Sequence, residues 1–292
     1  MQLSELTSMK MGGDASEFHV PRDSSGFGRL LGELRGRRPF ILGGGCNTLF
    51  PDGRFDRPVV STAKLKKVEI DGESVRAEAG VRLDLLIRQC IAAGLGGLEG
   101  LVGIPGTVGG ATAMNAGGHG GSFGDHVAEV GLLPLDGGSL VRMPGREIPW
   151  RYRSWNLAGL AVGWVRLALV RANATGLRKR ARQLFLRKSR TQPLAHPSSG
   201  CVFKNPRGGS AGAMIESLGL KGERRGGAII SDLHANFILN ERGDGSSADV
   251  VELIRFVRER VRESCGVWLE TEIVFAGESP LDATSPVATE SR

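Results

Sequence analysis

Residues 39–50 read Pro-Phe-Ile-Leu-Gly-Gly-Gly-Cys-Asn-Thr-Leu-Phe. The apolar run at 39–42 is typical of a short buried strand, and three glycines follow it directly. Because glycine has no side chain, such a loop lets backbone N–H groups approach an anion, for example a pyrophosphate. The alternative is a tight turn at a crowded packing point, which explains one glycine more readily than three in a row.

A second concentration of glycine lies further along the chain. Of the 44 glycines among 292 residues, 13 fall between Gly94 and Gly124. That window contains GIPGTVGG at 103–110 and MNAGG at 114–118. With 40% hydrophobic and 24% charged residues, the chain is globular and not disordered, and it lacks the strict glycine triplets of collagen. Two anion-friendly loops in a globular chain favour a large dinucleotide ligand.

The Rossmann fold is one candidate host for a dinucleotide. Residues 243–248 (GDGSSA) fit its Gly-x-Gly-x-x-Ala fingerprint, follow a strand-like segment at 237–240 and precede a helix. However, Asp244 would place a negative charge beside the pyrophosphate. The acid expected about 20 residues later, Glu263, falls inside the helix. A helix capped by Ser246 explains the same residues.

Hydrophobic periodicity gives a coarse map of the chain. The stretch at 171–190 contains eight basic residues and no acid, which predicts a helix with a solvated basic face at a domain boundary; phosphate contacts are the less favoured interpretation. In the segment 267–275, Glu270 and Glu272 share one face and the apolar residues the other. The patterns predict strands at 75–79, 127–135, 161–170 and 267–275, and helices at 83–91, 171–190 and 246–265, the last stopped by Gly266.

Composition narrows the classes of function. The apolar stretch at 157–170 contains Arg166 and is shorter than the ~20 residues of a membrane helix, and the N-terminus lacks a secretory layout. We therefore expect a cytoplasmic protein with no membrane partner. The four cysteines lack Cys-x-x-Cys spacing and the five histidines form no ligand pair, which predicts free thiols and no metal site. The net charge of +7, from 30 arginines and 8 lysines against 31 acids, suits phosphate-bearing partners but equally fits a compositional bias.

Seven motifs stand in order along the chain. They are LGGGCNTL (42–49), GLEGLVGIPGTVGG (97–110) with MNAG (114–117), YRS (152–154), PSSGCVFKNP (197–206), GLKG (219–222), SDLHANFILN (231–240) and LETEI (269–273). In these motifs the chain resembles the UDP-N-acetylenolpyruvoylglucosamine reductase family, in its shorter form. The resemblance runs from about residue 7 to Gly277, nearly the whole chain.

The resemblance implies an α+β fold with an FAD-binding domain of the vanillyl-alcohol-oxidase type, made of two α+β subdomains. We expect that domain at 1–172, a C-terminal α+β substrate-binding domain at 173–277 and a disordered tail at 278–292. The implied enzyme holds FAD non-covalently, takes NADPH as co-substrate and is favoured to be a monomer. The residues expected at the cofactor are Gly43, Gly44, Gly45, Cys46, Asn47, Thr48, Gly103, Ile104, Pro105, Gly106, Thr107, Gly109, Gly110, Asn115, Ala116 and Gly117.

The implied reaction reduces an enolpyruvyl ether of a UDP-sugar to UDP-N-acetylmuramate, a peptidoglycan precursor. Hydride from flavin N5 reaches the methylene carbon, so negative charge spreads into the carboxylate and must be stabilised while a proton reaches the adjacent carbon. By resemblance, Arg153 polarises the carboxylate and Glu272 helps to stabilise the intermediate. The sequence pattern alone does not choose between Glu270 and Glu272, and both could be surface carboxylates.

The expected proton donor is Cys201, where the family usually has serine. A thiol has an ordinary pKa near ~8.5, so it is mostly protonated at neutral pH and is a stronger acid than an alcohol. A nearby lysine, Lys204, would instead favour a thiolate that cannot donate. We expect an active enzyme whose rate declines at alkaline pH; the alternative is an inert thiol in an inactive relative.

The substrate residues carried over from the resemblance are Lys204, Asn205, Tyr152 and Arg190. The chain departs from the family pattern at two neighbouring positions. Thr191 stands where the family commonly has lysine, so Arg190 would supply the charge to the substrate diphosphate. Trp155 stands where serine is common.

Two other functions compete with the reductase. An FAD-dependent oxidase of the same fold often anchors flavin covalently through a histidine in the first glycine loop, and residues 43–50 contain none. A basic nucleic-acid-binding protein could use the run at 171–190. That run has Phe185 as its only aromatic residue, so stacking platforms are scarce and we expect no nucleic-acid partner.

Overall fold

The computed structural model describes residues 1–118, 120–155 and 159–281. The chain forms two compact units. The first unit contains Met1, Ala15–Cys46 and Asp56–Gln192, and the second contains Gln2–Asp14, Asn47–Phe55 and the chain from Pro193 onward. The two units are defined by packing and not by which ligand each binds. The expected boundary at residue 172 between cofactor-binding and substrate-binding domains therefore stays a prediction. Residues 282–292 of the expected tail lie outside the described part of the chain.

A parallel sheet of three strands begins the first unit. Its strand order is β1 (Phe18–His19), β4 (Val59–Ser61), β2 (Phe40–Leu42). Helix α1 (Ser24–Glu33) starts at Asp23, whose carboxylate accepts a backbone N–H of the first turn, and it buries Phe27 and Leu31. The strand expected at 39–42 is thus confirmed as β2, and the first glycine loop leaves its C-terminal end.

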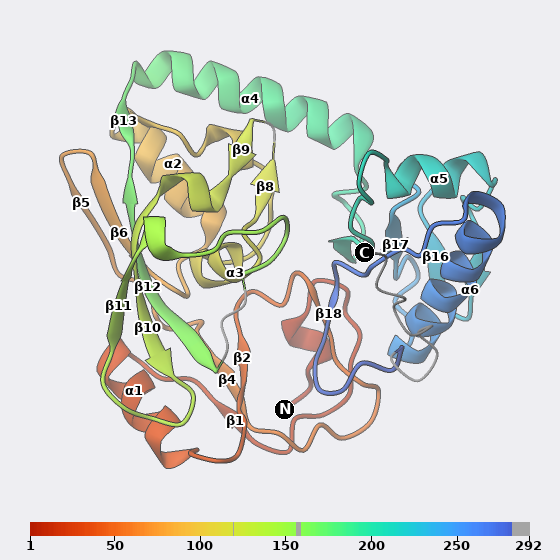
Figure 1. Cartoon of the computed structure of the whole chain (residues 1–292), viewed down its shortest axis with the longest axis horizontal. Coiled ribbons are helices and arrows are strands. Elements are labelled where there is room, and N and C mark those ends of the chain that lie inside the picture. Colours follow the sequence, from red (N-terminus) through yellow and green to blue (C-terminus); the bar gives the residue numbers. More distant parts are fainter. Residues whose placement is uncertain (119, 156–158, 282–292) are drawn as a thin grey trace, which may run out of the picture. The chain divides into compact units, whose positions relative to one another are not determined.

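A five-stranded antiparallel sheet forms the rest of the scaffold of the first unit (Figure 1). Helix α2 (Leu83–Ala92) packs against that sheet. All five apolar residues of its predicted stripe are buried in one core with sheet residues: Leu83, Leu86, Ile87, Cys90 and Ile91. The expected strands at 75–79, 127–135 and 161–170 are confirmed within about two residues at each end. The strand order is β11 (Val141–Pro144), β10 (Val127–Pro134), β12 (Leu160–Ala168), β6 (Ser74–Glu78), β5 (Val68–Asp71).

Helix α4 (Ala174–Thr191) ends the first unit and confirms the basic helix expected at 171–190. Only Leu177 and Ala181 of its side chains are fully buried, and its arginines are exposed. The remaining short elements of the unit are β7 (Leu95–Gly96), η2 (Glu99–Leu101), α3 (Val108–Ala113), β8 (Gly117–Gly118), β9 (Gly121–Ser122), η3 (Phe123–His126), η4 (Gly145–Glu147) and β13 (Val170–Arg171).

The second unit is built on a four-stranded antiparallel sheet with two helices, α5 (Ala211–Ser217) and α6 (Ser247–Cys265). Two N-terminal segments complete it, because Met9, Met11 and Leu49 pack in the same core as α6. The sheet order is β14 (Ser198–Cys201), β17 (Phe237–Leu239), β16 (Ala228–Ile230), β15 (Arg224–Arg225); a separate pair joins β3 (Thr48–Leu49) to β18 (Val274–Phe275), and η1 (Ser4–Leu6) lies near the N-terminus.

Helix α6 decides the question raised by residues 243–248. Ser246 and Asp249 form a reciprocal capping box, and Gly266 ends the helix in the left-handed region with φ of 68°. Strand β17, which precedes this helix, pairs antiparallel with both of its neighbours. A Rossmann unit requires a parallel βαβ crossover. The Rossmann interpretation is therefore wrong, and the capped helix is confirmed.

The strand expected at 267–275 is wrong over most of its length. Only Val274–Phe275 forms a strand, and an isolated bridge joins Thr271 to Phe203. The predicted alternation still holds, because Leu269 and Ile273 are buried whereas Glu270 is exposed. The ladder fails because the N–H groups of Glu272 and Ile273 both point at one acceptor, the carbonyl of Val202.

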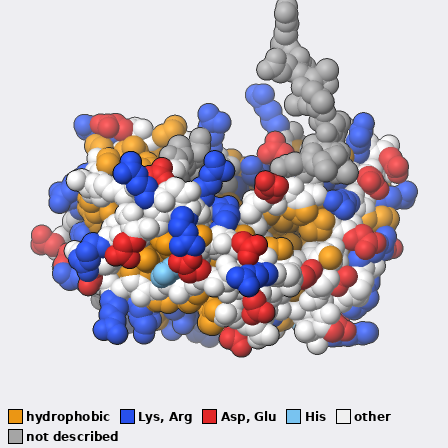
Figure 2. Space-filling view, turned by 90° about the horizontal axis from the view of Figure 1, so that it is seen from below, with side chains coloured by type: hydrophobic (Ala, Val, Ile, Leu, Met, Phe, Trp, Pro, Cys, Tyr) orange, Lys and Arg blue, Asp and Glu red, His pale blue; other side chains and the backbone are white. Residues whose placement is uncertain are grey.

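The described helices and surface carry two further observations. None of the helices within 1–118, 120–155 and 159–281 is both long and apolar enough to cross a membrane. On the face shown in Figure 2, lysine and arginine side chains are mixed with aspartate and glutamate side chains, so the excess of positive charge does not form one continuous field there.

Candidate functional site

The first glycine loop contacts the second glycine loop inside the first unit. A Cβ atom added at Gly43 would lie 2.7 Å from Thr107 Oγ1, and one at Gly44 would lie 2.9 Å from the Cα of Gly106. Gly45 adopts a left-handed φ of 62°. The two loops therefore meet backbone to backbone, and side chains at these positions would separate them.

The second loop owes part of its glycine content to packing. The Gly109 N–H donates to Ala79 O, and a Cβ there would lie 2.8 Å from the Ala79 Cβ. A Cβ at Gly103 would press on Lys188 and Phe185 of α4. The side chain of Thr107 caps α3 by accepting the Gly110 N–H. These glycines shape the loop without needing a ligand to explain them.

A small apolar cavity of about 100 Å³ lies against both loops. Its rim includes the side-chain-free positions Gly43, Gly109 and Gly110, and the rest is lined by Ile41, Thr62, Ala79, Ala113, Leu160, Ala161 and Val162. The first unit thus places three residues without side chains beside an apolar recess.

Arg153 sits on a tight turn of the first unit. Its φ of 53° is unusual for a residue with a side chain, and a bridge between Arg151 and Ser154 closes the turn. Its guanidinium stacks 4.9 Å from the Tyr152 ring centre, and a Cβ at Gly117 would fall 2.2 Å from Arg153 Nη1. Gly117 is therefore needed to let the Arg153 side chain lie along β8.

Asn115 supports that same turn. Its side-chain amide donates to the Arg151 carbonyl at 3.0 Å, and its side-chain oxygen accepts the Gly124 N–H at 3.0 Å. The residue is buried and has a φ of 40°. These contacts use both ends of the side-chain amide to hold the Arg153 turn, and contact of Asn115 with a cofactor stays a prediction.

Cys201 ends strand β14 in the second unit. Gly200 before it has a φ of 79°, and the pairing of β14 with β17 shifts register between Ser198 and Cys201. Cys201 is half-buried. It differs from Cys90, a core residue for which burial raises the pKa of the thiol to about 11. The irregular strand end leaves the Cys201 thiol partly accessible.

The structure separates the roles of Glu270 and Glu272. Glu270 is exposed and pairs with Lys204, with 3.2 Å between Oε2 and Nζ. Glu272 is half-buried. Its N–H donates at 2.7 Å to the carbonyl of Val202, the residue that follows Cys201. The backbone of both acids bonds to residues 202–204, but the Glu270 side chain is exposed and paired with Lys204, whereas Glu272 is half-buried.

Asn47 and Thr48 follow the first glycine loop in sequence but pack in the second unit. The Asn47 side chain donates to Glu272 O at 2.9 Å, and the Val274 N–H donates to Asn47 O at 3.0 Å. These two residues thus support the Glu272 segment, a role that sequence reasoning missed when it assigned them only to the cofactor.

The other expected substrate residues are placed on the surface. Tyr152 is 52% exposed, and Arg190 lies exposed in the last turn of α4. The side-chain oxygen of Asn205 accepts the Ala211 N–H at the start of α5. The role of these three residues at a substrate stays a prediction. Cys46 donates to Gly44 O, and Ile104, Pro105 and Ala116 complete the loops of the first unit.

Comparisons with known proteins decide the family. Residues 34–143 match the model of an FAD binding domain, and residues 192–276 match the C-terminal domain of UDP-N-acetylenolpyruvoylglucosamine reductase. The enzyme of that name from Moorella thermoacetica is 42% identical over 94% of this chain and 92% of its own length. The chain belongs to the UDP-N-acetylenolpyruvoylglucosamine reductase family.

Other members of this reductase family agree. The relative from Thermotoga maritima is 40% identical over 93% of this chain and 96% of its own length. The crystal structure of the Thermus caldophilus reductase superposes with a TM-score of 0.82 at 33% identity, covering 94% of this chain and 97% of that one. The expected fold class, an FAD-binding domain followed by the C-terminal domain of this reductase family, is confirmed, and the chain is a flavin oxidoreductase of peptidoglycan precursor synthesis.

The residues present fit the cofactor of this reductase family. The two glycine loops approach each other without side chains between them, which suits the close backbone contact that a diphosphate needs. Gly43, Gly44 and Gly106 would hold the diphosphate.

Replacing Gly44→Ala should weaken FAD binding. The added Cβ, 2.9 Å from the Gly106 Cα, must push the two loops apart, and overpacking of about 1.4 kcal/mol or more means roughly tenfold weaker binding. The ratio of flavin to protein absorbance after dialysis measures the loss. The control is Gly32→Ala in α1, where nothing lies within 4 Å. Unchanged flavin retention in Gly44→Ala would remove this loop from the cofactor site.

Proposed function

We propose that the chain catalyses the NADPH-dependent reduction of UDP-N-acetylglucosamine enolpyruvate to UDP-N-acetylmuramate. The observation that carries the proposal is the junction of two segments in the second unit, where the Glu272 N–H donates to the residue after Cys201. FAD, which Gly43, Gly44 and Gly106 would hold, would supply the transfer of hydride from NADPH to the substrate methylene carbon. The chain itself must bind the carboxylate, stabilise the charge and donate the proton.

Arg153 is the proposed carboxylate partner. Its guanidinium is held by the Tyr152 ring and by the glycine surface at Gly117, and the turn is fixed by Asn115. A planar guanidinium binds a carboxylate through two parallel hydrogen bonds. Arg153 would therefore orient the enolpyruvyl group and draw electron density towards the carboxylate.

Cys201 and Glu272 are proposed to act on the negative charge that hydride transfer leaves on the substrate. Negative charge on the carboxylate is stabilised by a hydrogen-bond donor, so Glu272 would act in its protonated form. Cys201 would transfer the thiol proton to the carbon next to the carboxylate and be reprotonated from solvent. Lys204, with Asn205, Tyr152 and Arg190, would bind the UDP-sugar.

An anaerobic spectral titration tests this function. NADPH should bleach the absorbance of the bound flavin near ~450 nm, and adding UDP-N-acetylglucosamine enolpyruvate should restore it stoichiometrically. Bleaching without recovery would refute the substrate assignment. Acid precipitation in the same preparation should release the flavin, because residues 43–50 contain no histidine to hold it covalently.

A further inference from the structure

Asn236 lies in the second unit beside the segment that follows Cys201. It is 3% exposed and precedes strand β17. Its backbone oxygen accepts the Val202 N–H at 2.9 Å, which continues the β14–β17 ladder one residue past Cys201. At that point the backbone pairing of the two strands stops.

The Asn236 side chain extends the ladder by one residue. Its Oδ1 accepts the Phe203 N–H at 2.9 Å, and its Nδ2 donates to Phe203 O at 2.8 Å. A side-chain amide therefore pairs with Phe203 in the two-way pattern of an antiparallel strand. Phe203 is 2% exposed, so no solvent would replace these bonds.

The opposite side of the same segment carries Glu272. The Val202 carbonyl accepts the Glu272 N–H, and the Lys204 N–H donates to Glu270 O at 2.9 Å. Residues 202–204 are thus held between Asn236 on one side and the Glu272 segment on the other. A shift of Phe203 would move Cys201 and Glu272 together.

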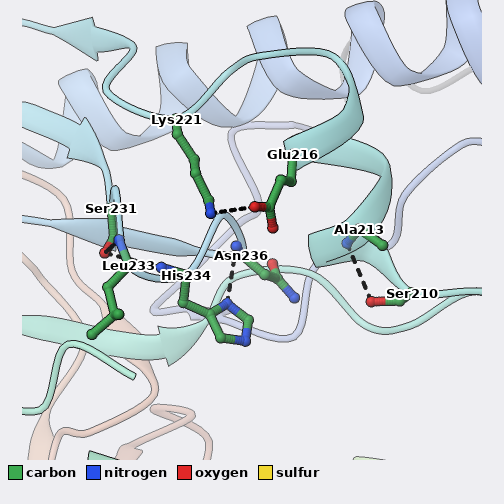
Figure 3. Close-up of polar contacts among 8 residues, drawn as sticks. All are labelled: Ser210, Ala213, Glu216, Lys221, Ser231, Leu233, His234 and Asn236. Atoms are coloured by element: carbon green, nitrogen blue, oxygen red, sulfur yellow. Dashed lines mark hydrogen bonds and ion pairs between the residues drawn. The ribbon is translucent and has the colours of Figure 1, made fainter. Parts of the chain in front are cut away.

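Asn236 is itself oriented by His234 (Figure 3). The Asn236 N–H donates to His234 Nδ1 at 3.2 Å, which requires that nitrogen to be unprotonated. Partial burial lowers the pKa of His234 and favours the neutral ring; a backbone hydrogen bond and the charge of Glu216 oppose the shift, and the charge of Lys221 adds to it. The His234 ring is braced edge-on against Phe237 at 4.8 Å.

We infer that Asn236 is a positioning residue, which fixes the geometry of Cys201 and Glu272 through its amide pairing with Phe203. The inference rests on the proposed function, because it assigns Asn236 to the same proton-transfer step. Aspartate at this position would keep the shape but lose the donor to Phe203 O, and alanine would lose both bonds. Asn236 touches neither reacting atoms nor cofactor in this role.

The chain provides a matched control in Asn240. It is also fully buried at the end of β17, and its side chain also bonds backbone in both directions, donating to Met9 O and accepting the Gly245 N–H. Its side-chain bonds go to Met9, Lys10 and Gly245 and not to residues 201–204. Substitutions at Asn240 should therefore reproduce the loss of stability without moving the Cys201 segment.

The experiment compares Asn236→Asp and Asn236→Ala with Asn240→Asp and Asn240→Ala in the full chain, each normalised to bound flavin. We expect flavin reduction by NADPH to stay within about twofold in all four. Reoxidation by UDP-N-acetylglucosamine enolpyruvate should fall about 30- to 100-fold in the Asn236 variants, in kcat more than in KM, since a misplacement of about 1 Å costs about that much. The Asn240 variants should stay within about threefold of the parent.

The outcomes separate the two proposals. If the parent chain itself is not reoxidised by that substrate, the proposed function fails. If the parent is reoxidised and Asn236 and Asn240 variants slow equally, or the loss lies only in KM, the positioning role fails. If Asn236→Asp does not fold, Asn236→Ala gives the same comparison, because alanine removes both bonds without placing a charge in the buried site.

Discussion

Replacing Cys201→Ala should abolish substrate reduction while sparing flavin reduction. A general acid contributes about 10²- to 10⁴-fold to a rate, and alanine has no proton to donate. The half-buried thiol follows Gly200 at the irregular end of β14, where alanine can replace it without disturbing the sheet. Stopped-flow measurement of each half-reaction would show normal bleaching by NADPH and a reoxidation rate reduced by at least about a hundredfold.

Two controls accompany Cys201→Ala: a substitution of another cysteine, and serine at position 201. Cys265→Ala, at the exposed last residue of α6, should behave as the parent chain. Cys201→Ser restores a proton donor and should recover reoxidation. It should also remove the alkaline decline of that step, because an alcohol does not ionise where a thiol does. Full reoxidation in Cys201→Ala would exclude the donor role.

Glu272→Ala should lower the rate of substrate reduction by about 10²- to 10³-fold, the usual effect of removing a hydrogen bond that stabilises an anionic intermediate. Glu272→Gln should recover part of this loss, since an amide N–H can donate where a protonated carboxyl did. The backbone bond from residue 272 to Val202 survives both substitutions. Single-turnover reoxidation measures the effect without the contribution of NADPH binding.

Glu270→Ala is the matched control for Glu272. It removes a carboxylate two residues away, 74% exposed and paired with Lys204, so both stability and turnover should change little. A large loss in Glu270→Ala with normal turnover in Glu272→Ala would reverse the assignment. Equal small effects would mean that neither carboxylate acts in the reaction.

The elements that the sequence predicted correctly are those whose signals are local. The stripe of α2 and the capping box of α6 depend on residues three or four positions apart, and both are confirmed. The segment at 267–275 has the alternation of a strand but pairs as one only at Val274–Phe275. Its partners, Val202 and Asn47, are about 70 and 225 positions away, so no local pattern reports them.

The candidate site likewise contains features that the sequence predicts and features that depend on contacts between distant residues. The contact of Gly44 with Gly106 was foreseeable as two glycine loops for one ligand, although their direct approach was not. Asn115 and Asn236 lie within two of the seven sequence motifs, but their roles depend on which distant carbonyl each side-chain amide bonds. The pairing of Lys204 with Glu270 likewise follows from the bridge of Thr271 to Phe203, not from residue type.

The composition of the second unit has a consequence for the order in which the chain folds. Met9, Met11 and Leu49 leave the ribosome first, yet their core partners on α6 are made about 200 residues later. All residues of the first unit, which ends at Gln192, are synthesised before α6, when these apolar side chains still lack their core. During synthesis the apolar side chains of these N-terminal segments therefore stay unpacked until α6 has been made. In that interval they are accessible to chaperones and to other nascent chains.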